Sequence, residues 1–208
     1  MPTDDKTVQI DLNDADASSA RTAAAHFDAL DILVVNGAVA KLIGFLDVSH
    51  TDHRAHYETN VVGPLSTIQA FLPALRKGQT RTIVLISSVV ASIASIAANV
   101  RKPVAERAPL AAGPYAASKA ALNLVGIGLF EALESEGFTV LLFHPGVVRT
   151  DMAPDFIKHI DALGDDAPFK AITVEESTAG MVGVIQKQIA TGTPTLRFAD
   201  YQDNELDF

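Results

Sequence analysis

The hydrophobic pattern of the chain alternates between short apolar runs and longer segments in which apolar residues recur at helical spacing. Short runs are typical of strands, above all of strands buried on both faces, whereas apolar residues three and four apart are typical of helices. The sequence therefore predicts strands at residues 7–12, 31–36, 81–88, 139–144 and 195–201. It predicts helices at residues 14–30, 47–76, 114–136 and 173–189.

Helix 47–76 is the longest predicted element. Ser49 with Asp52 is suited to cap its start. Asn60 and Pro64 fall inside it, so we expect a bend there.

Alternating strands and helices indicate an α/β fold with a doubly wound, Rossmann-like parallel sheet of about five strands. A chain of 208 residues is long enough for one substantial core, and we expect a single domain over residues 1–208. Two stretches interrupt the pattern. The charged stretch 89–113 is expected to be an irregular flap insertion, and 151–172, which mixes Pro, Asp and Gly, a mobile substrate flap.

Composition excludes several classes of protein. The net charge of −9 disfavours nucleic acid as a partner. Without cysteine the chain has neither disulfides nor thiolate chemistry. The acidic start resembles neither a signal nor a transit peptide, and no apolar run looks long and uncharged enough to span a membrane. We therefore expect a cytoplasmic protein that contacts no membrane.

Tyr115 and Lys119 are the first candidates for chemistry. A spacing of four places both side chains on one helical face. An ammonium held close to a phenol favours the phenolate and lowers the pKa, which gives a general acid or base. Taken alone, the spacing favours an ordinary surface lysine beside a half-buried tyrosine, because short motifs often occur by chance.

Polar residues also follow three of the predicted strands. Asn36, Ser88 and the Pro145-Gly146 turn stand at strand C-termini, and Tyr115 begins the helix after one of these strands. In doubly wound sheets, ligands bind at these strand ends. Convergence at one edge therefore predicts a functional site.

The histidines give a weaker signal. His50, His53 and His56 recur every third residue beside Asp52, but they share no helical face well and nothing completes a ligand set. We interpret them as an exposed polar face and predict no metal site. His144 ends a strand and is expected to be structural.

Several motifs in order resemble the short-chain dehydrogenase/reductase family, from Thr7 to the C-terminus. They are Asn36-Gly37-Ala38, the helix asparagine Asn60, the strand that ends in Ser88, the Tyr115 to Lys119 motif, and Pro145-Gly146-Val147-Val148-Arg149-Thr150. Val174 to Ser177 and Tyr201 to Phe208 resemble the small carbonyl-reductase branch related to C-signal and sniffer proteins.

The resemblance implies a catalytic set. Ser88 would donate a hydrogen bond to a substrate carbonyl, and Tyr115 would deliver the proton. Lys119 would lower the pKa of the tyrosine and hold the nicotinamide ribose. Asn60 would hold a water for proton relay.

The resemblance also implies NADP or NAD as cofactor. The implied binding residues are Asp11 and Leu12 beside the adenine, Asn36, Gly37, Ala38, Tyr115, Lys119, Pro145, Gly146, Val148 and Thr150.

The sequence departs from the family at its start, where the Gly-rich Thr-Gly-x-x-x-Gly-x-Gly turn is absent. An N-terminally truncated fold is expected, in which strand 7–12 pairs directly with strand 31–36. Losing two hydrogen bonds to the pyrophosphate would weaken cofactor binding about 10²- to 10⁴-fold. The stretch 89–113 also exceeds the family norm and either narrows substrate choice or is a solvated loop.

The leading hypothesis is an NAD(P)-dependent oxidoreductase that interconverts a carbonyl and an alcohol on a small substrate. Phe156 and Ile157 indicate an apolar one. The alternatives are a cofactor-free isomerase, dehydratase or cyclase that uses the Ser/Tyr/Lys set, a non-catalytic remnant that acts by dimerisation, and a truncated gene model. A homodimer through helices 47–76 and 114–136 is expected from the family's usual dimer face.

Overall fold

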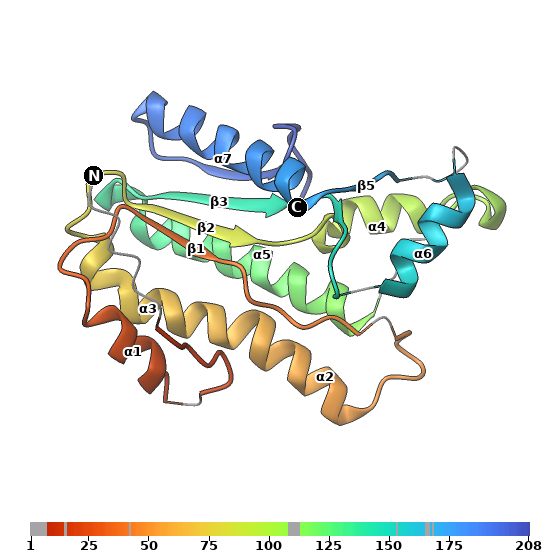
Figure 1. The fold of residues 1–208 in the computed structure, drawn as a ribbon, viewed down its shortest axis with the longest axis horizontal. Coiled ribbons are helices and arrows are strands. Elements are labelled where there is room, and N and C mark those ends of the chain that lie inside the picture. Colours follow the sequence, from red (N-terminus) through yellow and green to blue (C-terminus); the bar gives the residue numbers. More distant parts are fainter. Residues whose placement is uncertain are drawn as a thin grey trace.

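A four-stranded parallel sheet in the order β1-β2-β3-β6 lies at the centre of the fold. The computed structural model describes residues 8–208 except 15, 42, 108–112, 153, 165, 166 and 168 (Figure 1). The strands are β1 (Ile32–Val35), β2 (Thr82–Ile86), β3 (Thr139–His144) and β6 (Leu196–Asp200). A second, two-stranded sheet pairs β4 (Val147–Val148) with β5 (Ala171–Ile172). The predicted Rossmann-like α/β class is confirmed.

Helices cover the two faces of the sheet unequally (Figure 1). On one face lie α1 (Ser18–Ala24), α2 (His50–Tyr57), α3 (Gly63–Leu75) and α5 (Pro114–Leu133). The other face is covered by α7 (Val174–Thr191).

Strand side chains alternate between these two faces, as the pleat requires. Ile83 and Leu142 join the core under α3 and α5. Val84 and Phe143 pack instead against Val184 of α7. The continuous apolar runs of the sequence therefore reflect a sheet that is buried on both sides.

The predicted pairing of strand 7–12 with strand 31–36 is wrong. Residue 7 lies outside the described residues, residues 8–12 form no strand, and within the described chain β1 pairs with β2 alone. Asp11 instead begins a turn, because its Oδ1 accepts the Asn13 N–H at 2.9 Å and its carbonyl accepts the Asp14 N–H at 3.2 Å. This local hydrogen bonding competes with the ladder.

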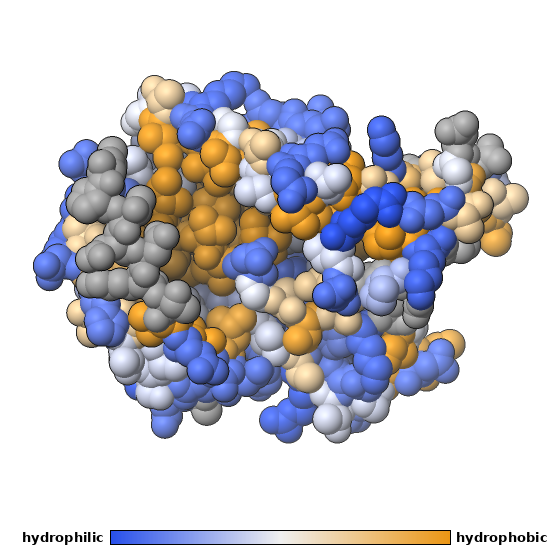
Figure 2. Space-filling model, in the orientation of Figure 1, coloured by the Kyte–Doolittle hydropathy of each residue, from blue (hydrophilic) through white to orange (hydrophobic). Residues whose placement is uncertain are grey.

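The open side of β1 leaves apolar surface uncovered. Val34, on the α7 side of the sheet, is 52% exposed. Figure 2 shows apolar residues gathered in a hollow of this face beside α7. An unpaired strand edge of this kind is a template for pairing with another strand.

The predicted helix 47–76 is present from His50 as α2, a π-helical segment η1 (Glu58–Val62) and α3. Ser49 caps it as expected, since its Oγ accepts the Asp52 N–H at 3.0 Å. The π-helical segment contains Asn60, where the bend was predicted, and π-bulges are frequent at functional sites.

The two predicted flaps contain regular structure in their described residues. Residues 89–107 include the 3₁₀ segments η2 (Val89–Ala91) and η3 (Val104–Glu106) and the helix α4 (Ile93–Val100), which Ser92 caps. The expectation of an irregular stretch is therefore wrong for this part, and residues 108–112 lie outside the described residues. The predicted substrate flap contains α6 (Pro154–Leu163) and β5, and its mobility stays a prediction.

Helix α5 corrects a further expectation. With the 3₁₀ segment η4 (Glu134–Glu136), it is long and apolar enough to cross a membrane by length and composition. In the fold, Leu122 and Leu133 place it in the hydrophobic core beneath the sheet. We therefore interpret it as a core helix.

Candidate active site

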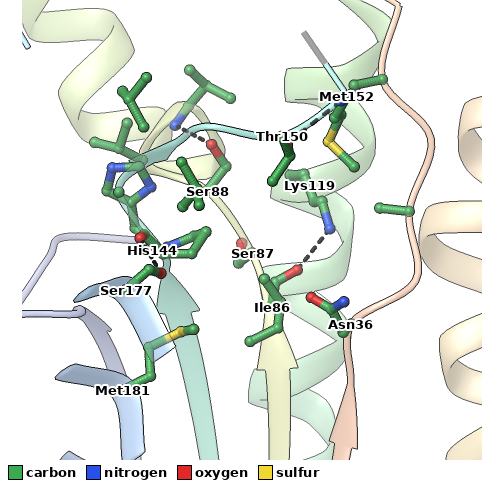
Figure 3. A pocket seen from close by; sticks show the side chains of 18 of the residues that line it. Asn36, Ile86, Ser87, Ser88, Lys119, His144, Thr150, Met152, Ser177 and Met181 are labelled. Carbon is green, nitrogen blue, oxygen red and sulfur yellow. Dashed lines mark hydrogen bonds between the residues drawn. The ribbon is translucent and has the colours of Figure 1, made fainter. Parts of the chain in front are cut away.

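A cavity of about 890 Å³ opens at the C-terminal ends of the strands. The ends of β1, β2 and β3 and the start of α5 contribute its polar side (Figure 3). The sequence-predicted residues that line it are Asn36, Gly37, Ala38, Ser88, Tyr115, Lys119, Pro145, Gly146, Val148 and Thr150. The convergence predicted from the strand ends is therefore confirmed.

Lys119 is the charged residue among those that line the cavity, and it is almost fully buried, at 2% exposed. Its Nζ donates a 2.7 Å hydrogen bond to the Ile86 carbonyl at the end of β2 (Figure 3). Burial lowers the pKa of Lys119 to about 8, so the ammonium form still predominates at neutral pH.

Tyr115 lies one helical turn earlier and is half-buried. Its ring centroid is 5.9 Å from Lys119 Nζ, within cation–π range. Burial raises the pKa of Tyr115, and a hydrogen bond with Ser88 acts in the opposite direction. The net lowering of this pKa that we expected is therefore wrong here, because burial outweighs the influences that favour the phenolate. A raised pKa keeps the phenol protonated.

Ser88 connects the end of β2 to this pair. Its Oγ caps η2 by accepting the Val90 N–H at 3.4 Å, and its hydroxyl interacts with Tyr115. Two hydroxyl groups from separate elements thus converge on one point of the cavity. Such a pair can bind one carbonyl oxygen.

Asn60 does not line the cavity but holds one of its loops in place. It is fully buried, accepts the Val39 N–H at 2.8 Å and donates to the Val39 carbonyl at 2.9 Å. Its amide also donates to Ser118 Oγ of α5 at 2.9 Å. Both amide N–H groups and the amide oxygen are thus hydrogen-bonded to protein groups, which gives the side chain a positioning role. The water-holding role that the resemblance implied stays a prediction.

His56 fixes the same loop, which the sequence pattern did not reveal. The expected exposed face is wrong for this residue, because His56 is only 3% exposed. One ring nitrogen, Nε2, accepts the Lys41 N–H at 3.0 Å, and Nδ1 lies 2.7 Å from the Asp52 carbonyl. Within the part of the chain that the structure describes, no cluster of His, Asp and Glu could hold a metal ion.

Asp11 and Leu12, predicted beside an adenine, do not line the cavity. Leu12 packs against Gly37 and Gly63, where an added Cβ would lie 2.7 Å and 2.3 Å from its atoms. The Asp11 N–H donates to Ser19 Oγ at 3.0 Å. Leu12 therefore supports the loop after β1 at Gly37, whereas Asp11 contacts Ser19 of α1.

The far wall of the cavity is apolar and comes from the predicted substrate flap and from α7. Its residues are Met152, Phe156, Ile157, Phe169, Val174 and Met181. Ser177 of α7 donates to the Pro145 carbonyl at 2.6 Å, which joins this wall to the turn after β3. The sequence placed Val174 and Met181 in a helix and the other four residues in the substrate flap, where Phe156 and Ile157 had indicated an apolar substrate.

The lining residues fit one half of a nicotinamide dinucleotide. Lys119 and Tyr115 are suited to ribose hydroxyl groups, and the turn from Pro145 to Thr150 offers main-chain groups to a carboxamide. A pyrophosphate is usually held by glycine-rich main chain at a helix N-terminus. Among the described lining residues no such turn is present.

Comparison with known proteins gives a consistent result. The short chain dehydrogenase family model matches residues 3–161. An uncharacterised oxidoreductase of Schizosaccharomyces pombe is 35% identical over 163 residues, 76% of this chain and 60% of that protein. The C-signal protein of Myxococcus xanthus is 34% identical over 178 residues, 85% of this chain and 92% of that protein.

Solved structures agree with these sequence matches. NADPH-bound carbonyl reductase from chicken fatty liver has a TM-score of 0.75 at 25% identity and is matched over 97% of this chain and 76% of that chain. The carbonyl reductase Sniffer of Drosophila melanogaster has a TM-score of 0.70 at 26% identity, and the match covers 97% of this chain and 77% of that chain. The chain thus spans about three quarters of these structures and 60% of the S. pombe relative.

Proposed function

Because the chain belongs to the short-chain dehydrogenase family, we propose that it is an NAD(P)-dependent oxidoreductase that interconverts a carbonyl and an alcohol. The proposed substrate is small and mainly apolar. One observation carries the proposal: Ser88, Tyr115 and Lys119 converge on one end of a cavity whose far wall is apolar. The NADPH-bound carbonyl reductase with the same fold supports the choice of cofactor.

The chain's own groups perform the proton chemistry. The hydroxyl groups of Ser88 and Tyr115 donate hydrogen bonds to the substrate oxygen, which stabilises negative charge as it develops there. Tyr115 then gives its proton to that oxygen. The phenol is protonated at neutral pH, as the reductive direction requires. A bound nicotinamide supplies the hydride.

Lys119 contributes charge and position. Its ammonium over the Tyr115 ring compensates the phenolate that forms after proton transfer. In the proposed complex its N–H groups also hold the ribose. Because pyrophosphate contacts are absent from the described lining, we propose that this chain binds the dinucleotide more weakly than a site with a glycine-rich turn does.

A redox-neutral reaction is the second candidate. The acid–base set faces the cavity while the pyrophosphate contacts are absent from its described lining, which is what an isomerase, dehydratase or cyclase without nucleotide would need. Turnover without added nucleotide would favour this candidate over the first.

We also propose a homodimer through the helices predicted for it. Tyr57 of α2, Val62 of η1 and Leu124 of α5 are 49%, 41% and 67% exposed. Apolar side chains gathered on neighbouring helices are typical of contact surfaces. Light scattering across a concentration series would detect the dimer, and a monomer at every concentration would contradict it. A chain that dimerises but turns over no substrate would be the non-catalytic alternative.

The first experiment is calorimetric titration of NADPH and NADH into the chain, followed by a spectrophotometric assay of NADPH oxidation with small ketones. Tyr115→Phe should abolish turnover, because the proton donor is lost. His26→Phe, at an exposed position after α1, is the control and should leave turnover unchanged. Full activity of the Tyr115 variant would refute the assigned role.

A further inference from the structure

His144 is a cavity residue that the proposed proton chemistry does not use. It ends β3, and its side chain lines the cavity on the side formed by β3 and α7, across from Lys119 (Figure 3). Its main-chain carbonyl accepts the Tyr201 N–H at 3.1 Å, which fixes the residue at the strand end. We expected a purely structural role for His144, but such a role does not explain why its ring nitrogens have no hydrogen-bond partner in the described chain.

The two ring nitrogens of His144 have different surroundings. Nδ1 is buried and has no hydrogen-bond partner among the described residues. Nε2 also has no hydrogen-bond partner in the described chain. Unlike Nδ1, it is not fully buried, so it is accessible from the cavity. Since the side chain borders the cavity, this accessible edge of the ring is the one available to a bound molecule.

Neighbouring polar groups are already engaged. The carboxylate of Asp200, the residue beside His144 in the β3–β6 ladder, accepts the Gln202 and Asn204 N–H groups and the Asn204 amide, each at 2.9 Å. Ser177 donates to the Pro145 carbonyl. Neither group is hydrogen-bonded to the imidazole, so a partner for the ring comes from solvent or from a molecule bound in the cavity.

The imidazole is neutral and presents a donor. Burial lowers the pKa of His144 to about 4, although the negative charge of Asp200 acts in the opposite direction. A neutral imidazole carries one N–H, and a buried N–H without an acceptor is more costly than an unpaired lone pair. The proton therefore belongs on Nε2, which makes the accessible edge a hydrogen-bond donor.

We propose that His144 determines specificity by donating a hydrogen bond from Nε2 to a second acceptor on the substrate, a carbonyl oxygen other than the one that reacts at Ser88 and Tyr115. The preferred substrates are therefore small dicarbonyl compounds with apolar flanks. Met181 and Val174 line the same wall and provide no competing polar group. In such surroundings a donor that the ligand leaves unmatched lowers affinity, which penalises monocarbonyl compounds. This inference rests on the proposed function.

The test compares matched substrates in matched variants. Diacetyl, acetylacetone and acetonylacetone carry two carbonyl groups at increasing separation, and the monoketones of equal chain length are their controls. His144→Phe keeps a ring but removes the donor, whereas His144→Gln restores an amide N–H. Exposed His26→Phe controls for surface changes.

The expected result is a selective loss. In His144→Phe, kcat/KM for the preferred diketone should fall about 10- to 100-fold, with little change for its monoketone. His144→Gln should recover part of the loss, and His26→Phe should lose nothing. An equal fall for both compounds, or none for either, would overturn the proposal.

A second readout separates this inference from the proposed function. Nitrogen NMR of the chain labelled at histidine should show the His144 proton on Nε2, and addition of the diketones without nucleotide should shift that signal while the monoketones do not. If no ketone is turned over but the signal shifts, the proposed function fails and the binding role stands. A proton on Nδ1, or equal shifts with both compound classes, would contradict the role itself.

Discussion

Replacing the buried Lys119 by methionine should make the stability of the chain depend on pH in a defined way. The ordinary pKa of 10.5 applies to the unfolded chain, and burial lowers it to about 8 in the folded one. Each unit corresponds to about 1.36 kcal/mol, so the charged side chain destabilises the fold by about 3 kcal/mol at neutral pH. This penalty is fully present below the folded pKa and disappears as the pH rises to the unfolded one.

The substitution also removes a favourable contact. The Ile86 carbonyl loses the 2.7 Å hydrogen bond from Nζ, which costs roughly 1–3 kcal/mol for a buried acceptor. At neutral pH, Lys119→Met should therefore be up to about 2 kcal/mol more stable than the native chain. Near the unfolded pKa only the lost hydrogen bond remains, so the variant should be the less stable of the two.

Urea denaturation followed by circular dichroism at intervals from about pH 7 to about pH 10 measures this difference. The advantage of the variant should fall by about 1.4 kcal/mol per pH unit above the folded pKa. Lys77→Met, at an exposed position, should show no such slope relative to the native chain. A pH-independent difference between native chain and Lys119→Met would show that the lysine is not charged and desolvated as the structure indicates. Loss of turnover in Lys119→Met would show that the Lys119 side chain is required for activity.

Two further predictions concern stability. The pKa of His144 is about 4 in the folded chain, below its ordinary 6.5 despite Asp200, so the unfolded chain gains a proton first as the pH falls. Relative to His144→Phe, the native chain should lose about 3 kcal/mol of unfolding free energy as the pH falls between these two values, and none above them. Urea denaturation of both chains across this pH range measures the difference. Gly63→Ala should destabilise by more than about 1 kcal/mol, because the new Cβ would lie 2.3 Å from the Leu12 carbonyl oxygen. Gly128→Ala, in α5 with open space around it, should instead stabilise by about 0.5–1 kcal/mol, and thermal melts of both variants test the pair.

Much of the architecture was predictable because it depends on periodicity and local chemistry. Apolar runs placed β1, β2 and β3, and the cap at Ser49 set the start of the long helix. Polar residues at strand ends predicted which side chains meet, since parallel strands bring their C-terminal ends to one edge. Ser88, Tyr115 and Lys119 therefore appear together in the cavity as expected.

The remaining features depend on tertiary surroundings that no local pattern encodes. Residues 8–12 could form a strand only beside another strand. They form a turn instead, in which the Asp11 side chain accepts the Asn13 N–H. The burial of His56 and the saturation of Asn60 depend on a loop that crosses them. The pKa of Tyr115 likewise depends most on its burial, which the spacing from a lysine does not encode.

The helical segment from His56 to Val62 has one side that contacts the loop at the cavity and one side that is exposed. His56 and Asn60 hold the loop that borders the cavity, while Tyr57 and Val62 face outward. A molecule that packs on the outward side and stiffens this segment would also stiffen the loop. If the proposed homodimer forms on that side, a ligand that orders the loop would by thermodynamic reciprocity strengthen dimerisation by the same factor. Ligand affinity measured at rising protein concentration should therefore increase.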